Sequence, residues 1–463
     1  MTHPARRAGS ALATLAVCAL ACSPGEGGPT SPAEAPGADL ILHGGVVIAA
    51  DPEFSIAEAI AITDGRIVRV GTTSDVLEAA GTKTRVVDLE GRTVLPGLVD
   101  PHVHYIQHQT PDVENMVEDQ RILLSWGRTT VGIPAAIPIN LTGYQRMLDA
   151  GELKLRLHAY LSWNNNCGEP EDVSFWNDYT FTRSAEHRLA IAGVKVFMDG
   201  GSCRAPAVSF DFDDAPIALP EGWAGHGDLF TSAEELAEVV RLVGGRGGQV
   251  VAHAIGDRAV AAALDGYAQA LGGGPNPNGH RIDHITFVRP EQVGRFGALR
   301  VNAVVWGVFN ACIEPDLGWA SFLDDDQRQW LRQHRAVIDG NPDIAVAFHS
   351  DVPWTEGSPF HQLLGLTAMA QYDDAFGGPC PGPAWLSGHE VTVPEAIRMM
   401  TISAARVMGI ADEVGSIEVG KRADLVVFAN NPLGQSGFEL LDNHVSATLI
   451  DGDTVWCDDA WCR

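Results

Sequence analysis

Short apolar runs, many of them β-branched, alternate with tight turns at both ends of the chain. In the segment 38–95, the apolar stretch Ala59–Val70 is interrupted by Asp64-Gly65. An Asp-Gly pair between two apolar runs is a strong signal for a β-hairpin. The same pattern returns in 413–463, around Asp451-Gly452. We therefore predict one small β-sandwich that is built from both ends of the chain.

The middle of the chain, 96–412, alternates strand-like apolar runs with segments that carry helix-start signals. Thr231-Ser-Ala-Glu234 and Thr392-Val-Pro-Glu395 both match the capping box that opens many helices. The candidate strands are 95–103, 129–135, 155–162, 193–198, 249–253, 281–287, 301–309 and 344–349. Eight strands alternating with helices favour the α/β class and predict a (β/α)8 TIM barrel.

The first 21 residues have the pattern of an export signal. Arg6 and Arg7 precede an apolar run, Ala8–Ala21, that is too short for a permanent membrane span. The segment 1–21 followed by Cys22 is similar to a bacterial lipoprotein signal, which implies a lipid anchor on Cys22. Plain secretory cleavage is the alternative. The Pro/Gly/Ser-rich segment 22–37 is predicted to be a flexible tether. The protein is thus expected to be exported, either periplasmic or membrane-anchored.

Charge and cysteine content narrow the environment further. The net charge of −28 disfavours a nucleic-acid partner, because both molecules would be polyanions. Export would permit disulfides. Cys457 and Cys462 are close enough in sequence to pair, whereas the pairing of the other four is open. Those four are Cys167, Cys203, Cys312 and Cys380.

Side chains that bind metals fall at the ends of the predicted barrel strands. His102 and His104, in Pro96-Gly-Leu-Val-Asp-Pro-His-Val-His104, are two residues apart and so share one face of a strand. Four more lie in or just after later strands: Lys195, His253, His284 and Asp351. Such barrels carry their active sites at the carboxyl ends of the strands. We therefore expect these six side chains to converge on one mouth, where imidazoles and carboxylates suit zinc and related ions.

These motifs, in this order, resemble the metal-dependent amidohydrolase superfamily, and most closely its YtcJ-like (amidohydrolase 3) branch. The matching segments are 96–104, 193–201, 253–260, 281–284, 350–351 and 415–427. The resemblance implies that one or two divalent ions, usually zinc, bind to His102, His104, Lys195, His253, His284 and Asp351. It implies that Lys195 is carboxylated on its amine and bridges the two ions. An unmodified Lys195, either in a one-metal site or paired with Asp199, is the alternative.

The resemblance also implies the chemistry. Asp351 would be the catalytic residue, a metal ligand that takes a proton from the attacking water and passes it to the leaving nitrogen. A bound metal would lower the pKa of that water and polarise the scissile carbonyl. The expected function is hydrolysis of carbon–nitrogen bonds in a small-molecule amide other than an ordinary peptide. An esterase or lactonase using the same site is one alternative, and a catalytically degenerate binding lipoprotein is another. Membrane contact is expected only through Cys22, and the oligomeric state stays open.

Two departures from the family pattern affect the expected pocket. His349 stands where a small residue is usual, and either a pocket role or a structural role suits it. The loop 199–204 reads Asp-Gly-Gly-Ser-Cys-Arg, which differs from the usual motif and predicts a different specificity. Other residues near strand ends are candidates for the pocket wall: His108, Trp163, Asn164–Asn166, His226, Trp306 and Trp319.

Overall fold

The computed structural model describes residues 37–108, 110, 112–215, 219–306, 311–312, 319–458 and 461–462. Eight parallel strands form the centre of the fold, each paired with the next along the chain. They are β8 (Leu98–Asp100), β9 (Arg128–Ala136), β10 (Arg156–Ser162), β11 (Leu189–Phe197), β12 (Gln249–Ala254), β13 (Arg281–His284), β14 (Asn302–Trp306) and β15 (Val346–His349). The predicted (β/α)8 barrel is thus confirmed.

The seam between the first and last barrel strands is bridged just beyond their ends. Within the described ranges, β8 and β15 share no ladder of their own. Instead, the amide of His104 donates to the carbonyl of Val352 at 2.7 Å, and the amide of Asp351 donates to that of His102 at 3.2 Å. These bonds nearly close the barrel. They also place the His-x-His segment beside Asp351.

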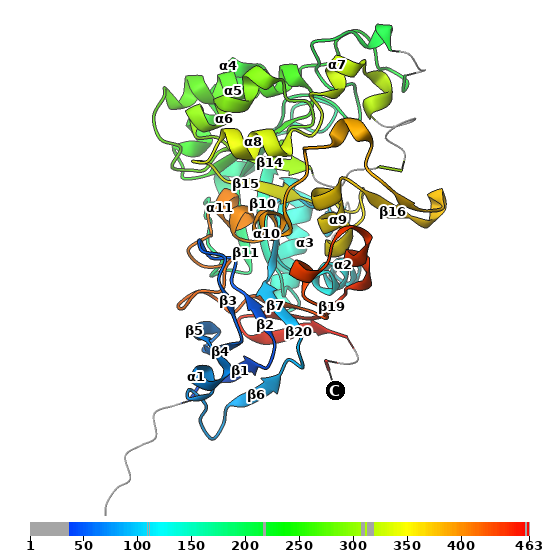
Figure 1. Ribbon diagram of the computed structural model, residues 1–463. Helices are drawn as coiled ribbons and strands as arrows, with labels where there is room; N and C mark the ends of the chain where they lie inside the picture. The colour runs from blue at the N-terminus through cyan, green and yellow to red at the C-terminus, as the bar shows by residue number, and fades with distance from the viewer. Residues whose placement is uncertain are drawn as a thin grey trace, which may run out of the picture. The chain divides into compact units, whose positions relative to one another are not determined.

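Helices cover the outside of the barrel and follow the strands in the expected alternation (Figure 1). The helices are α2 (Val113–Ser125), α3 (Pro138–Asp149), α4 (Ala233–Gly244), α5 (Asp257–Leu271), α6 (Pro290–Leu299), α7 (Asp325–Arg328), α8 (His334–Gly340), α9 (Pro359–Ala368), α10 (Val393–Met399) and α11 (Ile402–Met408). Strand β11 shows how the layers form. Val194, Val196 and Met198 join the core beneath the helices, whereas Lys195 lies on the opposite, inward face.

One of the two predicted capping boxes is confirmed and the other is wrong by one residue. Thr392 caps α10 together with Glu395, as expected. Helix α4 is capped by Ser232 and Glu235, because the Thr231 hydroxyl donates to the carbonyl of Phe197 and is not available as a cap.

The terminal segments form two further sheets, which pack face to face around a shared apolar core. The four-stranded sheet contains β5 (Arg66–Gly71), β4 (Ala59–Thr63), β1 (Leu40–His43) and β6 (Arg85–Asp88), with α1 (Thr73–Leu77) nearby. The six-stranded sheet contains β20 (Asp453–Cys457), β19 (Val445–Ile450), β18 (Leu425–Phe428), β7 (Thr93–Pro96), β2 (Val46–Ile48) and β3 (Ile56–Ala57). Figure 1 shows strands from both chain ends side by side, as the sandwich prediction requires.

Both Asp-Gly pairs form the predicted two-residue hairpin turns. Asp64 and Gly65 have φ values of 49° and 72° between the paired residues Thr63 and Arg66. Asp451 and Gly452 have φ values of 52° and 78°. Two successive positive φ values are what a type I′ turn requires, and Asp and Gly tolerate them best.

The strand expected over 95–103 is divided between the two parts of the fold. Thr93–Pro96 pairs with β18 in the sandwich, and Leu98–Asp100 pairs with β9 in the barrel. Gly97 lies at the crossing, where an added Cβ would come within 2.4 Å of the Thr129 side chain. The strand expected over 301–309 ends at Trp306, and residues 307–310 lie outside the described ranges.

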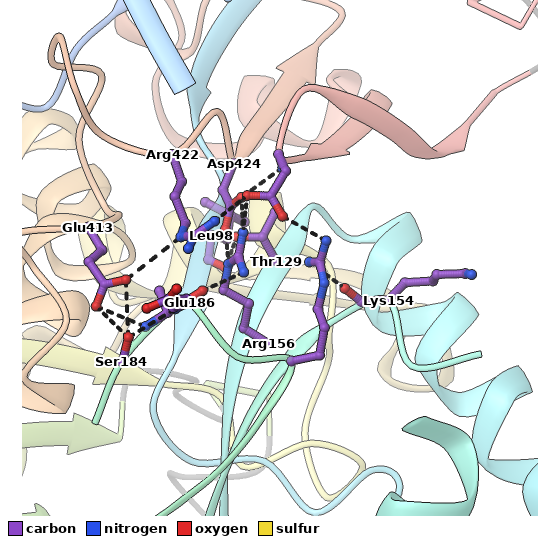
Figure 2. A network of polar contacts seen from close by, with 12 residues as sticks. Leu98, Thr129, Lys154, Arg156, Ser184, Glu186, Glu413, Arg422 and Asp424 are labelled. Atoms are coloured by element: carbon purple, nitrogen blue, oxygen red, sulfur yellow. Dashed lines mark hydrogen bonds and ion pairs between the residues drawn. The ribbon is translucent and has the colours of Figure 1, made fainter. Parts of the chain in front are cut away.

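A buried ion network joins the sandwich to the amino-terminal end of the barrel (Figure 2). The guanidinium of Arg156 at the start of β10 donates to both oxygens of Asp424, at 2.7 and 2.9 Å. The same guanidinium also contacts Asp451 at 2.6 Å. Asp451 in turn forms ion pairs with Arg188 and Arg422. Both charges of the Arg156–Asp424 pair are fully enclosed. This network ties together the end of the barrel opposite to the carboxyl ends of its strands.

All six cysteines of the barrel and sandwich are paired. The disulfides are Cys167–Cys203, Cys312–Cys380 and Cys457–Cys462. The local pair at the C-terminus is as predicted. Cys380 ends a small hairpin of β16 (Gln371–Asp373) and β17 (Gly378–Cys380). None of the helices in the described part of the chain combines the length and hydrophobicity of a transmembrane span. The predicted signal 1–21, Cys22 and the tether up to residue 36 lie outside the described residues.

Candidate metal centre

The two histidines of the His-x-His segment lie directly after β8 and meet Asp351 from the far side of the barrel seam. Both carry their Nε2 atoms close to Oδ1 of Asp351, at 3.4 Å for His102 and 3.3 Å for His104. Val103 between them is fully buried in the core, so the expected alternation holds although the segment has left the strand. These three side chains form one group whose ligand atoms could share a metal ion.

His284 reaches the same site through a break in strand alternation. Arg281 and Asp283 contact each other inside the barrel, so regular alternation would send His284 outward. His284 instead has φ 77°, and its ring lies 4.8 Å from that of His102 and 4.4 Å from that of His253. Asp351 also has a positive φ, 61°. Backbone outliers of this kind cluster at functional sites, where the surrounding structure holds them in place.

His253 and Lys195 lie on the neighbouring strands β12 and β11, with Phe197 paired to His253. The Nε2 atom of His253 lies 3.0 Å from the carbonyl oxygen of Gly200, in the loop after β11. His253 contacts the His284 ring but belongs to neither of the metal-sized groups of side chains. The Lys195 Nζ makes no hydrogen bond to any described residue, and Oδ2 of Asp283 is 3.9 Å away. Burial lowers the pKa of Lys195 to about 8, although Asp283 opposes the shift.

Asp283 is a site residue that sequence reasoning missed. Its Oδ2 accepts a hydrogen bond from Nδ1 of His102 at 2.8 Å, and its Oδ1 accepts one from Nε of Arg281 at 2.9 Å. A carboxylate on the second nitrogen of a metal-binding histidine fixes the tautomer and orients the ring. The signal was present in Arg281-Ile-Asp283, where two charges share one face of an otherwise apolar strand.

The side chain of His349 lies at this mouth too, where it is the fifth imidazole. It ends β15 and is fully buried. Its ring stacks on His102 at 4.7 Å and meets His284 edge-on at 4.7 Å. His102, His284 and His349 form a second group whose ligand atoms lie within 4.8 Å of one another.

The protonation states at the site suit a cation. Burial, followed by the nearby Lys195, lowers the pKa of His102 well below its usual value, and burial likewise lowers the pKa of His284. Their ring nitrogens therefore keep free lone pairs. Burial alone would raise the pKa of Asp351, but His104 and His102 hold it below its usual range, so the carboxylate stays ionised.

Several buried polar atoms at the mouth, which could each bind a metal ion, have no hydrogen-bond partner among the described residues. They are Nζ of Lys195, Nδ1 of His284 and both ring nitrogens of His349. Leaving such groups unpaired costs about 1–3 kcal/mol each. Imidazole nitrogen and carboxylate oxygen are also the donors that zinc and similar ions take in proteins. The residues present therefore fit a divalent metal.

Of the residues predicted to form the pocket wall, one lies near the metal-binding side chains, and the others pack or form hydrogen bonds elsewhere. Trp306 lies 6.3 Å from the His284 ring, and Trp354, which was not predicted, lies 6.4 Å from the His104 ring with 74% of its surface exposed. Asn164 has a structural role, since it exchanges hydrogen bonds with the backbone of Phe197.

The other candidates have partners of their own. His108 contacts Asp119 at 2.7 Å, and His226 contacts the carbonyl of Phe210 at 2.7 Å. Trp163 pairs with Trp176, and Trp319 with Phe287 and Trp223. Asn166 donates to Ser202 across the two loops that the Cys167–Cys203 disulfide joins.

An eight-stranded parallel barrel with imidazoles and a carboxylate at its carboxyl mouth defines a class of metal-dependent hydrolases. The chain belongs to the amidohydrolase family, whose family model matches residues 112–456. It is similar to the protein LONG AFTER FAR-RED 3 of Arabidopsis thaliana, with 23% identity over 90% of this chain and 92% of that one. It is also similar to an N-substituted formamide deformylase of Arthrobacter pascens, with 23% identity over 89% and 97%.

A solved structure with the same fold is that of an uncharacterized metal-dependent hydrolase from Pyrococcus horikoshii. It superposes with a TM-score of 0.70 at 18% identity, covering 88% of this chain and 99% of that one. Together, the family match and the site show that the chain is a metal-dependent hydrolase acting on carbon–nitrogen bonds, with a divalent metal as cofactor.

Proposed function

We propose that the protein hydrolyses a non-peptide amide, such as an N-formyl or N-acyl amide, and that zinc is its metal. The observation that carries this proposal is the convergence of His102 and His104 on the same oxygen of Asp351, at 3.4 and 3.3 Å. The similarity to an N-substituted formamide deformylase along nearly the whole chain supports the substrate class.

Six residues would hold the metal, as one ion or two: His102, His104, Lys195, His253, His284 and Asp351. When bound, the metal supplies an acidified water and a polarised scissile carbonyl. Asp351 is ionised and next to the ligand nitrogens, so its carboxylate accepts a proton from the attacking water. The same group then donates that proton to the leaving nitrogen, which would otherwise depart as a strongly basic anion. The exposed Trp354 beside His104 supplies an apolar face for the substituent of the amide.

Lys195 is proposed to carry a carboxyl group on its amine. With a pKa of about 8, a useful fraction of the amine is neutral near pH 7 and is able to attack carbon dioxide. A nitrogen–carbon bond then forms and one proton is released, which leaves an anionic carbamate. Since Asp283 is 3.9 Å away, this anion needs a cation between the two groups. The alternative is an unmodified ammonium paired with Asp283. Carbon-13 NMR of protein grown with labelled bicarbonate distinguishes them, because only the carbamate gives a new carbonyl signal.

The proposal is tested by Asp351→Asn, with Asp119→Asn as the matched control. Asp119 lies on α2, outside the site, and its carboxylate pairs with His108 and accepts from the Ile106 amide. We expect Asp351→Asn to lower kcat by at least about 10²–10⁴-fold, the usual loss for a proton-transfer group. The control should keep its rate. A screen of formamides, acylamides, esters, lactones and dipeptides identifies the substrate. Ester or lactone cleavage alone would establish the esterase alternative, and zinc-free, inactive protein would favour the binding lipoprotein.

We further propose that the protein is exported and held by lipid on Cys22. Three disulfides, formed by every cysteine of the barrel and sandwich, suit an oxidising compartment. Cys22→Ser should release the protein from membrane fractions. Wild-type protein that is already soluble and unlipidated would contradict the anchor and leave plain secretion.

A further inference from the structure

His349 is the one imidazole of the mouth to which neither the family pattern nor the proposed mechanism gives a role. It ends β15, two residues before Asp351, and the side chains of both residues contact His102. Its ring is completely buried and in contact with His102 and His284. A structural role would be to fill the space beside His102.

The hydrogen-bond state of His349 leaves both of its ring nitrogens available to a ligand. Neither of its ring nitrogens has a hydrogen-bond partner among the residues that the structure describes. A neutral imidazole always carries one acceptor and one donor, and burying them unpaired is costly. A phenylalanine would fill the same space without that cost.

A ring nitrogen of His349 lies close to ligand nitrogens of two other histidines. The ligand atoms of His102, His284 and His349 lie within 4.8 Å of one another, and all three residues are buried. Two nitrogens bound to one tetrahedral zinc are about 3.3 Å apart, given a Zn–N distance of about 2.0 Å. Modest side-chain rotations would therefore bring the three nitrogens onto one ion.

The hydrogen bond between His102 and Asp283 limits how the ions are shared. Since Nδ1 of His102 donates to Asp283, only Nε2 can bind a metal, and it offers a single lone pair. The group His102–His104–Asp351 and the group His102–His284–His349 both draw on that atom. When two ions are present, the ion next to His284 loses His102 to the other group and needs a different nitrogen. His349 is positioned to supply it.

We infer that His349 is a metal ligand, which binds the inner ion together with His284. The inference rests on the proposed metal site and adds a ligand to it. An inner position with mainly imidazole ligands favours zinc, nickel or copper over magnesium, calcium or manganese. The inner ion should therefore resist exchange by magnesium even at millimolar concentration.

The test compares His349→Phe with His158→Phe. Phenylalanine keeps the ring and its packing but removes the nitrogens. His158 is an equally buried histidine on β10 whose ring nitrogens also have no hydrogen-bond partner among the described residues, but it belongs to neither metal-sized group. Zinc per chain and zinc affinity, measured by chelator competition, are the readouts. We expect His349→Phe to lose one zinc or at least about 10–100-fold in affinity, a loss known even for groups outside the ligand sphere. His158→Phe should match the wild type.

Wild-type metal content and affinity in His349→Phe would overturn the inference and leave the amidohydrolase proposal intact. If wild-type protein itself binds no zinc, the proposed metal site fails as well. Should His349→Phe not fold, anomalous diffraction at the zinc edge from wild-type crystals decides the question. A zinc–nitrogen bond to His349 supports the inference, and an inner ion without that bond overturns it.

Discussion

Replacing Asp283 by Asn would test how the interior of the barrel supports its metal ligands. The substitution keeps the size of the side chain and removes its charge. Burial alone would raise the pKa of Asp283, but Arg281 and His102 hold it well below its usual range, so the native group is a buried anion. Its neighbours are Arg281 at 2.9 Å, His102 at 2.8 Å and Lys195 at 3.9 Å.

Two losses follow from these contacts. Removing one partner of a buried ion pair costs about 3–5 kcal/mol, because the other charge stays enclosed. Arg281 still donates to the carbonyl of Pro101 and to the Tyr160 hydroxyl, so we expect a value near the lower end, about 3 kcal/mol. The second loss is the carboxylate that orients His102. Loss of such a partner lowers metal affinity by about 10–100-fold.

The two losses are measured separately on metal-free and zinc-loaded protein. Urea unfolding in the presence of a chelator gives the stability term without the contribution of bound metal. Chelator competition then gives the zinc affinity. Asp265→Asn is the control, since Asp265 forms an exposed pair with Arg295 and should shift stability by less than about 0.5 kcal/mol. If Asp283→Asn matches the control in stability and the wild type in zinc affinity, the support assigned to Asp283 is wrong.

Three further predictions concern Arg156 at the amino-terminal end of the barrel, the buried His158, and the proposed metal ligand His253. Arg156→Met leaves Asp424 enclosed without a counter-charge and should lower the free energy of unfolding by about 3–5 kcal/mol, against little change for the exposed Arg121→Met. Burial lowers the pKa of His158 from 6.5 to about 3, so the unfolded chain binds the extra proton between these values. Stability should therefore fall as the pH is lowered from 7 to 5, by about 2 kcal/mol more than in His158→Phe, as urea titrations would show. His253→Asn should lower bound metal and abolish turnover, and full metal content with full activity would remove His253 from the site.

The barrel strands were predictable because each is buried on both faces and therefore appears as a continuous apolar run. All eight runs correspond to strands of the barrel. The errors occur where tertiary contacts override a local pattern. Thr231 has the sequence of a cap but donates its hydroxyl to Phe197, so the cap moves to Ser232. The run at 95–103 is apolar throughout, and only the pairing of Pro96 and Leu98 with different sheets shows that it serves both.

The candidate ligands were predictable from their order along the chain, because barrel topology brings successive strand ends to one mouth. The sequence could not show which of them lie close enough together to share an ion, since that depends on side-chain direction. Alternation places Asp283 inward and His284 outward, and only the left-handed φ of His284 brings its ring to His102 as well. His349 was visible as an unusual residue, but its contact with His102 depends on how β15 meets β8 across the seam.

The two ends of the barrel divide stability and chemistry between them. At the amino-terminal end, the charges of Arg156 and Asp424 are paired and fully hydrogen-bonded, which ties the sandwich to the barrel. At the carboxyl end, buried nitrogens of Lys195, His284 and His349 have no hydrogen-bond partner in the described part of the chain. Each of these groups destabilises the metal-free fold, and the ordered base supplies the rigidity that keeps them in place. Metal binding should therefore stabilise this protein strongly, because it satisfies several buried groups at once.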